Sequence, residues 1–261
     1  MSTIKPRKEC LLFLSHHTRP KAMASLKKLR ADCAHLDIIP VFDQTQGLVD
    51  VDNIPGAWRI NCEDITRLLN YPIKHQHHPG TFWPKNIDLP LMAFFRQQPH
   101  YDYYWVIEYD VRFTGNWQDF FKHFQLNDSD LLTTTLYDYA IRPQWANWNS
   151  LRSPIPVPES DRTRALLSFF RISQKAITRL HEAYTQGWGG HYEVTIPTVL
   201  RHYGYKLEDM GGDGSYVAPE NINRFYTNTP KNPGLAPGTY VLNEWQRQKN
   251  IIPNMLYNPF K

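Results

Sequence analysis

The sequence predicts a single-domain α/β fold with a mixed, mostly parallel sheet flanked by helices. Three observations support this prediction. A strand, a helix and a second strand follow one another near the start, a strongly apolar strand occupies the middle of the chain, and further strands and helices alternate after it. With 261 residues and 41% hydrophobic content, the chain can bury one sizeable core, and its composition demands no second one.

The first unit predicts a parallel βαβ arrangement. An apolar strand at 10–14 is followed by a polar loop, a helix at about 21–34 and a strand at 37–42 that ends at Asp43. The loop contains Ser15, His16, His17 and Arg19. Such a unit resembles the opening of a nucleotide-binding half, in which the loop after the first strand meets the base and ribose. Because neither a G-x-G-x-x-G nor a Walker sequence follows the first strand, dinucleotide and P-loop chemistry are disfavoured.

The central strand, at 103–111, ends in two carboxylates one residue apart, Glu108 and Asp110. Alternation along a strand predicts that both lie on the same face. In an open α/β sheet the carboxyl ends of the strands border the ligand crevice, where acidic oxygens can hold Mg²⁺ or Mn²⁺ against a diphosphate. The alternative, which spacing alone leaves equally open, is that Glu108 caps a turn while Asp110 pairs with Arg112.

The other elements are predicted in order around this strand. Helices are expected after Asn61, at 89–97 and at 117–124, and a strand at 130–136. The segment 137–161 is rich in Trp and Pro and predicts a long surface excursion, in which Trp145 and Trp148 either face an acceptor sugar or anchor the loop.

The last third of the chain predicts a strand at 165–172, a helix that Ser173 caps and Gly187 ends, and a glycine-rich corner at 187–193. We expect Pro197 in the first turn of the next helix, so that Glu193 would lie just ahead of that helix. A strand at 206–210 follows. Residues 1–228 are predicted to form the domain, and 229–261 to be a tail that packs on it.

Charge and cysteine content limit the functional classes. Lys and Arg number 29 against 25 Asp and Glu, and this scattered net charge of +4 suits an anionic small substrate but is too weak to indicate nucleic acid. The three cysteines are widely spaced and predict reduced thiols in the cytoplasm. Peripheral attachment to the inner face of a membrane stays open as an alternative.

The residues 105–115, WVIEYDVRFTG, together with the early βαβ unit and the later Gly190-His191-Tyr192-Glu193, resemble a GT-A-type glycosyltransferase, a Rossmann-related fold. The resemblance spans roughly residues 10–213. Families of this fold commonly have a D-x-D motif, and Glu108 stands where its first aspartate would be. The resemblance implies transfer of a sugar from a nucleoside-diphosphate donor to a hydroxyl of a glycan or lipid-linked acceptor, assisted by Mn²⁺ or Mg²⁺.

The resemblance also implies roles for individual residues. Asp110 would bind the metal, Glu108 would contact the metal or the ribose, and a third ligand would come from the later part of the chain, with His191 favoured over His202 and Asp213. Glu193 would be the catalytic base, with Asp209 in reserve. The nucleotide sugar would be held by Ser15, His16, His17, Arg19 and Asp43, and the acceptor by Trp145, Trp148 and Trp188.

Two other functions remain as alternatives. The first is a non-catalytic carbohydrate- or nucleotide-binding domain of the same fold. The second is a zinc-dependent hydrolase that uses His75, His77 and His78, although a solvated loop is the favoured interpretation of this histidine cluster.

Overall fold

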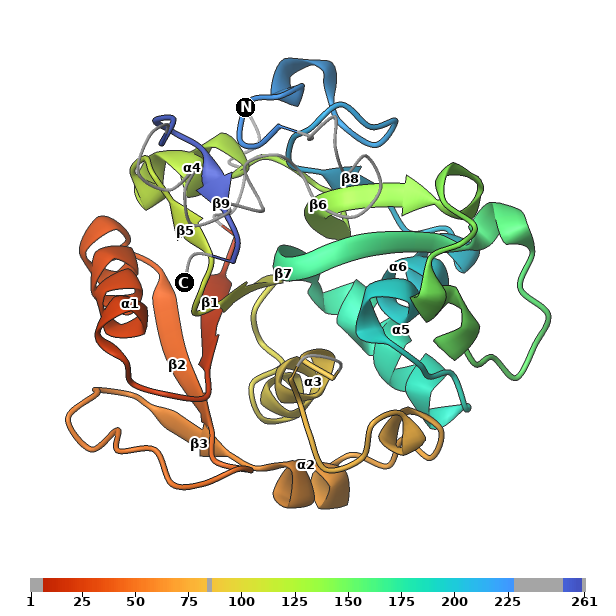
Figure 1. The fold of residues 1–261 in the computed structure, drawn as a ribbon, viewed down its shortest axis with the longest axis horizontal. Coiled ribbons are helices and arrows are strands. Elements are labelled where there is room, and N and C mark those ends of the chain that lie inside the picture. Colours follow the sequence, from red (N-terminus) through yellow and green to blue (C-terminus); the bar gives the residue numbers. More distant parts are fainter. Residues whose placement is uncertain (1–6, 84–85, 228–250, 260–261) are drawn as a thin grey trace.

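A computed structural model describes residues 7–83, 86–227 and 251–259, and its main feature is a seven-stranded sheet in the order β3-β2-β1-β4-β7-β6-β8 (Figure 1). β7 runs antiparallel to both of its neighbours, and the other pairs in the sheet are parallel. The strands are β1 Glu9–Ser15, β2 Asp37–Asp43, β3 Trp58–Ile60, β4 Tyr103–Glu108, β6 Leu131–Asp138, β7 Thr163–Ser173 and β8 Leu207–Asp209. The predicted mixed, mostly parallel α/β sheet is therefore confirmed.

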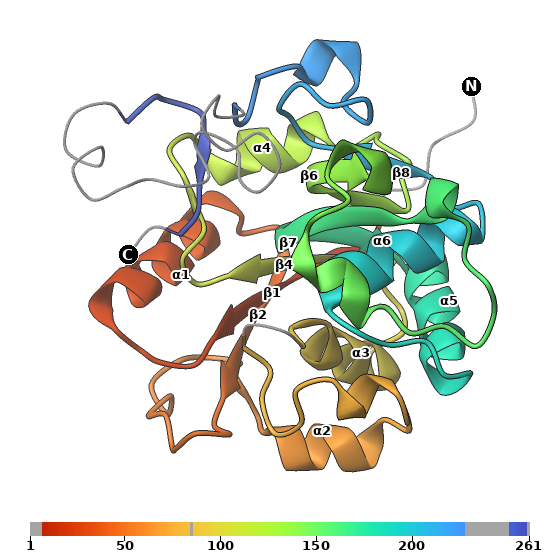
Figure 2. The same ribbon diagram turned by 45° about the vertical axis from the view of Figure 1, so that its right-hand side comes forward.

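Helices cover both faces of this sheet (Figure 2). The α-helices are α1 Pro20–Asp32, α2 Cys62–Leu68, α3 Asp88–Gln97, α4 Trp117–His123, α5 Gln174–Thr185 and α6 Tyr192–His202. Short 3₁₀ helices are η1 Lys74–Gln76, η2 Tyr139–Ile141, η3 Ala146–Ser150, η4 Glu159–Asp161 and η5 Pro219–Asn221. Side chains from α1 and α4 pack on one face, and those from α2, α3, α5 and α6 pack on the other.

Much of the aromatic content lies in the core beneath α4. Trp105 of β4 lies 4.8 Å from Phe121 and 5.4 Å from Phe169 of β7, measured between ring centroids. These rings are buried, and offset or edge-to-face pairs of this kind add about 0.5–1.5 kcal/mol each beyond the apolar area they bury. The large aromatic core is thus one reason why Trp, Tyr and Phe are so frequent.

The central strand is shorter than the sequence predicts. β4 ends at Glu108, and Tyr109 and Asp110 form a turn before β5, Arg112–Phe113. The prediction that Glu108 and Asp110 share a strand face is wrong for this reason, because the alternation of side chains does not continue through a turn.

The helix α6 begins earlier than predicted. Its first residue is Tyr192 and its N-cap is His191, so Glu193 lies in the first turn and Pro197 lies inside the helix. The expected placement of Pro197 in the first turn is therefore wrong. Hydrogen bonds in the glycine corner before α6, described below, place the first residue of the helix closer to Gly190 than the sequence predicts.

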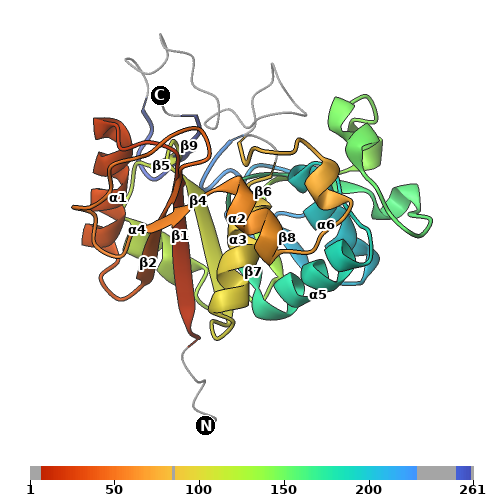
Figure 3. The ribbon, with the colours of Figure 1, turned by 90° about the horizontal axis from the view of Figure 1, so that it is seen from below.

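The end of the chain returns to the sheet. Within 251–259, β9, Leu256–Tyr257, pairs antiparallel with β5. Most of the predicted tail of 229–261, namely 229–250 and 260–261, lies outside the described residues. In Figure 3 the strands β1 and β4 run upward, and β9 and the 139–162 segment lie near their upper, carboxyl ends.

Cys10, Cys33 and Cys62 are free and buried, and the cytoplasmic location stays a prediction. In the described part of the chain, no helix has both the length and the apolar character that crossing a membrane requires.

Candidate functional site

Three neighbouring parallel strands end at one edge of the sheet, and each is followed by predicted site residues. In the strand register Leu14 of β1 pairs with both Val41 of β2 and Glu108 of β4, so the three carboxyl ends lie level. The loop after β1, Asp43 at the end of β2 and Glu108 at the end of β4 therefore meet at this edge, as the βαβ pattern predicts.

A cavity of about 400 Å³ opens beside the loops after β1 and β2. Its lining residues are His16, Asp43, Gln46, Gly47, Leu48, Val49, Thr81 and Trp83. The ring of His16 lies 5.5 Å from that of Trp83 and 5.2 Å from that of Tyr109. The cavity thus combines flat rings with a carboxylate and an amide side chain, which suits a heterocyclic base with polar edges.

The polar residues of the two loops also organise their own backbone. Ser15 Oγ donates to the carbonyl of His17 at 2.7 Å, and Asp43 Oδ1 accepts from the Thr45 amide at 2.8 Å. The backbone N–H of Arg19 lies 3.4 Å from His17 Nδ1. Ser15 and Asp43 therefore shape the loops by local hydrogen bonds, whereas His16 and Asp43 line the cavity.

Glu108 lies at the end of β4 and is influenced by two other carboxylates. Its Oε2 accepts a hydrogen bond from Trp83 Nε1 at 3.3 Å. Burial, followed by the negative charges of Asp110 and Glu193, raises the pKa of Glu108 well above its ordinary value, and the Trp83 hydrogen bond opposes the rise. The end of β4 and the start of α6 are therefore electrostatically coupled here.

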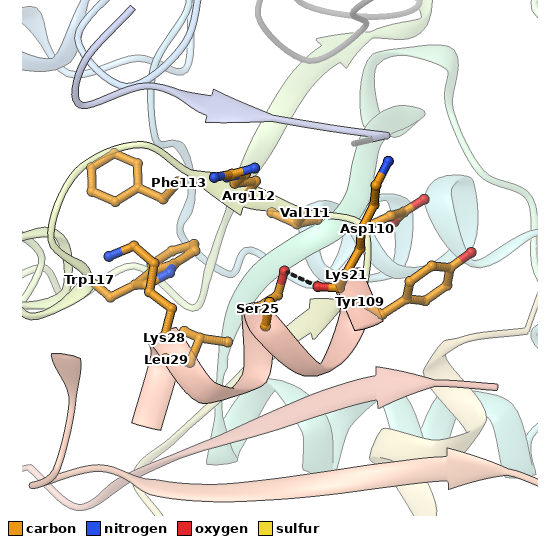
Figure 4. A pocket seen from close by; sticks show the side chains of 11 residues that line it. Lys21, Ser25, Lys28, Leu29, Tyr109, Asp110, Val111, Arg112, Phe113 and Trp117 are labelled. Carbon is orange, nitrogen blue, oxygen red and sulfur yellow. Dashed lines mark hydrogen bonds between the residues drawn. The ribbon is translucent and has the colours of Figure 1, made fainter. Parts of the chain in front are cut away.

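Asp110 is hydrogen-bonded to a residue near the end of the chain. Its Oδ1 accepts from Asn258 Nδ2 at 3.0 Å, and Asn258 directly follows β9. A second cavity, of about 160 Å³, separates the turn at Asp110 from α1, and Lys21 and Arg112 are among its lining residues (Figure 4). Cations thus lie close to Asp110 on the side that faces α1.

Glu193 is held by the strand against which α6 packs. Its Oε1 accepts from the Leu167 amide of β7 at 3.4 Å. Burial raises the pKa of Glu193 to about 7, while the Leu167 N–H and the positive charge of Arg164 oppose this rise. A carboxyl with a pKa near neutrality is suited to general-base chemistry at physiological pH.

The glycine corner before α6 is fixed from two sides. Gly190 has φ +116°, and a Cβ there would collide with the carbonyl of Ser150. On the other side the buried Lys74 Nζ donates to the Gly190 carbonyl at 2.9 Å and pairs with Asp88 at 3.0 Å. This corner can be filled only by glycine, and it sets the position of Glu193.

The two tryptophans of the 139–162 excursion have different environments. Trp148 is buried and its Nε1 donates to the Arg142 carbonyl at 2.9 Å, so it anchors the loop. Trp145 is partly exposed, and its ring lies 6.2 Å from that of His191. Trp188 has no exposed surface and lies against His202, so the expected acceptor contact does not hold for Trp188.

The reserve base and the other candidate ligands have structural partners. Asp209 is buried and accepts from the Leu136 amide, the Gly211 amide and the Tyr226 hydroxyl at 2.9, 3.1 and 2.6 Å. Burial raises the pKa of Asp209 to about 7 against these hydrogen bonds. His202 Nδ1 lies 2.8 Å from an Asp161 oxygen, and Asp213 is exposed. Asp209 therefore joins β6, β8 and the following loop.

His191 does not fit the predicted role of metal ligand. Its Nδ1 accepts from the Glu193 amide at 3.3 Å, as an N-cap. A neutral imidazole that accepts at Nδ1 has its proton at Nε2 and so offers no lone pair to a metal. Over 7–83, 86–227 and 251–259, no three His, Cys, Asp or Glu side chains form a group that could hold a metal. The alternative of a zinc site at His75, His77 and His78 therefore has no support among these residues.

Glu108 and Asp110 fit another mode of cation binding. Mg²⁺ is usually held by one or two carboxylates together with substrate phosphates, without an all-protein cage. Burial is the main cause of the raised pKa of Glu108 and repulsion by Asp110 adds to it, and a bound cation would offset both effects. The two carboxylates therefore suit a metal that arrives with a diphosphate.

Sequence reasoning missed four residues that build the site: Trp83, Lys74, Arg164 and Asn258. Trp83 and Asn258 come from irregular segments, and nothing in the sequence pairs them with Glu108 and Asp110. Arg164 did leave a signal, because it is one of two charged residues in a strand that is otherwise uncharged and mostly buried.

Comparisons with known proteins give a partial match. The family model described as a protein of unknown function (DUF3405) matches residues 63–127, a segment that includes α3, β4 and both Glu108 and Asp110. Sequence comparison with curated proteins finds no match.

The chain also resembles solved structures of two glycosyltransferases and one nucleotidyltransferase. The galactosyltransferase LgtC, in complex with donor and acceptor sugar analogues, is 10% identical, with a TM-score of 0.44, over 95% of this chain and 86% of that one. The bifunctional glycosyltransferase WbbM is 6% identical, with a TM-score of 0.44, over 79% and 39%. A glucose-1-phosphate thymidylyltransferase from Bacillus anthracis is 12% identical, with a TM-score of 0.39, over 77% and 87%. Likenesses at this level establish neither activity nor substrate.

Proposed function

We propose that this chain is a glycosyltransferase that moves a sugar from a nucleoside-diphosphate donor to a hydroxyl of a glycan or lipid-linked acceptor. One observation supports the proposal above the others. Glu108, at the carboxyl edge of the sheet, is electrostatically coupled to both Asp110 and Glu193. A donor cavity and a partly exposed Trp145 flank this cluster.

The donor binds with its nucleoside in the cavity that His16, Asp43 and Trp83 line. Its diphosphate would lie toward Glu108 and Asp110, the two residues that would hold Mn²⁺ or Mg²⁺. When bound, the cation supplies Lewis-acid stabilisation of the charge on the departing nucleoside diphosphate. Trp83, which lines the cavity, donates to Glu108 and so favours the ionised form of that carboxylate against the effect of burial.

Glu193 accepts the proton of the acceptor hydroxyl. As the acceptor oxygen forms a bond to the anomeric carbon, the bond from that carbon to the diphosphate oxygen breaks, and the nucleoside diphosphate leaves with the electron pair. The pKa of about 7 leaves a large fraction of Glu193 ionised at neutral pH while keeping it basic enough to take the proton. The Leu167 amide orients the carboxylate through Oε1.

The test is a turnover screen of nucleotide sugars with Mn²⁺ on the wild type, Asp110→Asn and Glu193→Gln. We expect Asp110→Asn to lose donor turnover and the thermal stabilisation that nucleoside diphosphate plus Mn²⁺ confers. Glu193→Gln should keep donor binding and lose transfer by about 10²–10⁴-fold, the usual contribution of a general base. Glu182→Gln, on the exposed side of α5, is the matched control and should behave as wild type.

Two results would contradict this proposal. Undiminished transfer in Glu193→Gln would remove Glu193 as the base. Nucleotide binding without turnover of any donor would favour the alternative of a non-catalytic binding domain.

A further inference from the structure

Arg164 is a buried cation that forms no ion pair with any residue in the described part of the chain. It is the second residue of β7, and 4% of its surface is exposed. Within the described residues its Nε and Nη2 atoms have no hydrogen-bond partner. A buried guanidinium that leaves donors unpaired is costly, so such a group calls for an explanation, for example a bound anion.

Two aromatic rings hold the Arg164 guanidinium in place. Its Cζ atom lies 4.9 Å from the ring centroid of Trp145 and 5.7 Å from that of Tyr137. Tyr137 is also its partner in the register of β6 and β7. Cation–π contacts of this type fix the plane of the group but satisfy none of its N–H donors.

Arg164 belongs to the cluster that surrounds the proposed base. Trp145 contacts His191, and His191 caps the helix turn that contains Glu193. Glu193 does not pair directly with the Arg164 guanidinium. Both side chains are described, and no N···O distance between them is within 4.0 Å. Their attraction acts at longer range and opposes the rise in the Glu193 pKa.

Other charges near Arg164 make an added anion favourable. Burial and, to a smaller extent, the positive charge of Arg142 lower the pKa of Arg164 to about 10, against the attraction of Glu193. An anion bound at Arg164 would favour its charged form and offset both effects.

The position of Arg164 favours the acceptor over the donor as the source of that anion. Arg164 is not among the residues that line the cavity at His16 and Trp83. It instead contacts Trp145 of the 139–162 excursion, whose residues are also absent from the lining of that cavity. A group bound to Arg164 would therefore approach the base from the acceptor side.

We propose that the acceptor is an acidic glycan, whose carboxylate or phosphate is bound by Arg164 while its hydroxyl is presented to Glu193. This inference rests on the proposed function and names the acceptor class. The partly exposed Trp145 provides a flat face for the sugar ring beside the charged group. Arg164 is thus a specificity residue that selects the acceptor by charge.

The test compares matched sugars with and without an acidic group. The probes are methyl β-D-glucoside, methyl β-D-glucuronide and glucose 6-phosphate, and binding is measured by NMR titration in the presence of UDP and Mn²⁺. We expect an acidic probe to bind the wild type at least about tenfold more tightly than the neutral glycoside. Whichever acidic probe shows the preference identifies carboxylate or phosphate as the preferred group.

Variants then assign the preference to Arg164. Arg164→Met should abolish it, Arg164→Lys should retain part of it, and Arg67→Met, which removes an exposed arginine of α2, should leave it intact. Equal binding of acidic and neutral probes by the wild type would overturn the inference without any variant, so it stays testable if Arg164→Met fails to fold. An unchanged preference in folded Arg164→Met would overturn it as well.

Separate readouts distinguish this inference from the proposed function. If Arg164→Met loses UDP binding, the anion is the donor diphosphate and the inference is wrong. If the acidic preference is present but no nucleotide sugar is turned over, the acidic site stands while the transferase proposal fails. If donors are turned over and the acidic preference is absent, only the acceptor inference fails.

Discussion

The raised pKa of Glu193 predicts a specific dependence of stability on pH. Its side chain is 15% exposed, and burial raises its pKa from 4.5 to about 7. The pKa of Glu193 is higher in the folded protein than in the unfolded chain. Protonated Glu193 therefore contributes its full stabilisation below pH 4.5, and this stabilisation is lost as the pH rises through about 7. At about 1.36 kcal/mol per pKa unit, the loss amounts to about 3 kcal/mol.

The substitution Glu193→Gln removes this loss. Glutamine keeps an oxygen for the Leu167 amide but has no proton to release, so the variant should gain about 3 kcal/mol over the wild type between pH 4.5 and pH 8. The assay is urea unfolding of both proteins at pH 4.5, 6 and 8, with the difference in free energy of unfolding followed across the series. Glu182→Gln is the control, and its difference from the wild type should not change over this range.

A difference between Glu193→Gln and wild type that stays constant from pH 4.5 to 8 would refute this reasoning, because Glu193 would then ionise without a burial cost. A difference of the opposite sign, with the wild type gaining on the variant as pH rises, would show that nearby cations outweigh burial.

Two further predictions concern the residues around the site. Lys74→Met should destabilise the fold by about 3–5 kcal/mol because the buried Asp88 loses its cation, although the Tyr184 hydroxyl still donates to it. Lys74→Met/Asp88→Leu should recover part of that loss, because it removes the buried charge but leaves the Tyr184 hydroxyl without its acceptor. Urea unfolding checks both variants, and a double variant no more stable than the single one would contradict the account. Trp83→Phe keeps a ring in the donor cavity but removes the N–H that Glu108 accepts, which raises the pKa of Glu108 further. Transfer at pH 7 should fall about tenfold while UDP binding changes little, and equal losses in both would assign Trp83 to nucleotide binding alone.

The sheet was largely predictable because its strands are uniform in character. The residues from Cys10 to Leu14 are all buried, and so are those from Tyr103 to Ile107, so continuous apolar runs identified both strands. The parallel pairing followed from the intervening helix α1. Chain order alone could not show that β7 runs antiparallel or that the short β9 returns to β5.

The site was less predictable because its contacts join distant segments. Glu108 and Glu193 were identified from their local sequence, but their coupling depends on the packing of α6 against β7. Trp145, Trp148 and Trp188 cannot be told apart by residue type. Only their burial shows that Trp148 anchors the loop and Trp188 belongs to the core, whereas Trp145 is partly exposed. His191 was assigned to a metal because sequence cannot show that its ring nitrogen caps a helix.

The way in which the excursion leaves and rejoins the sheet has a consequence for engineering. Asp138 at the end of β6 and Thr163 at the start of β7 are paired neighbours, so residues 139–162 depart and return at one place. Closing a longer or shorter loop between fixed neighbours costs little, since each doubling in length adds only about 0.6 kcal/mol. A graft of this segment from another protein would exchange Trp145 while the donor cavity stays in place, and it should retain Ser150, because Ser150 packs against Gly190 and accepts from the His191 amide at the corner that positions Glu193.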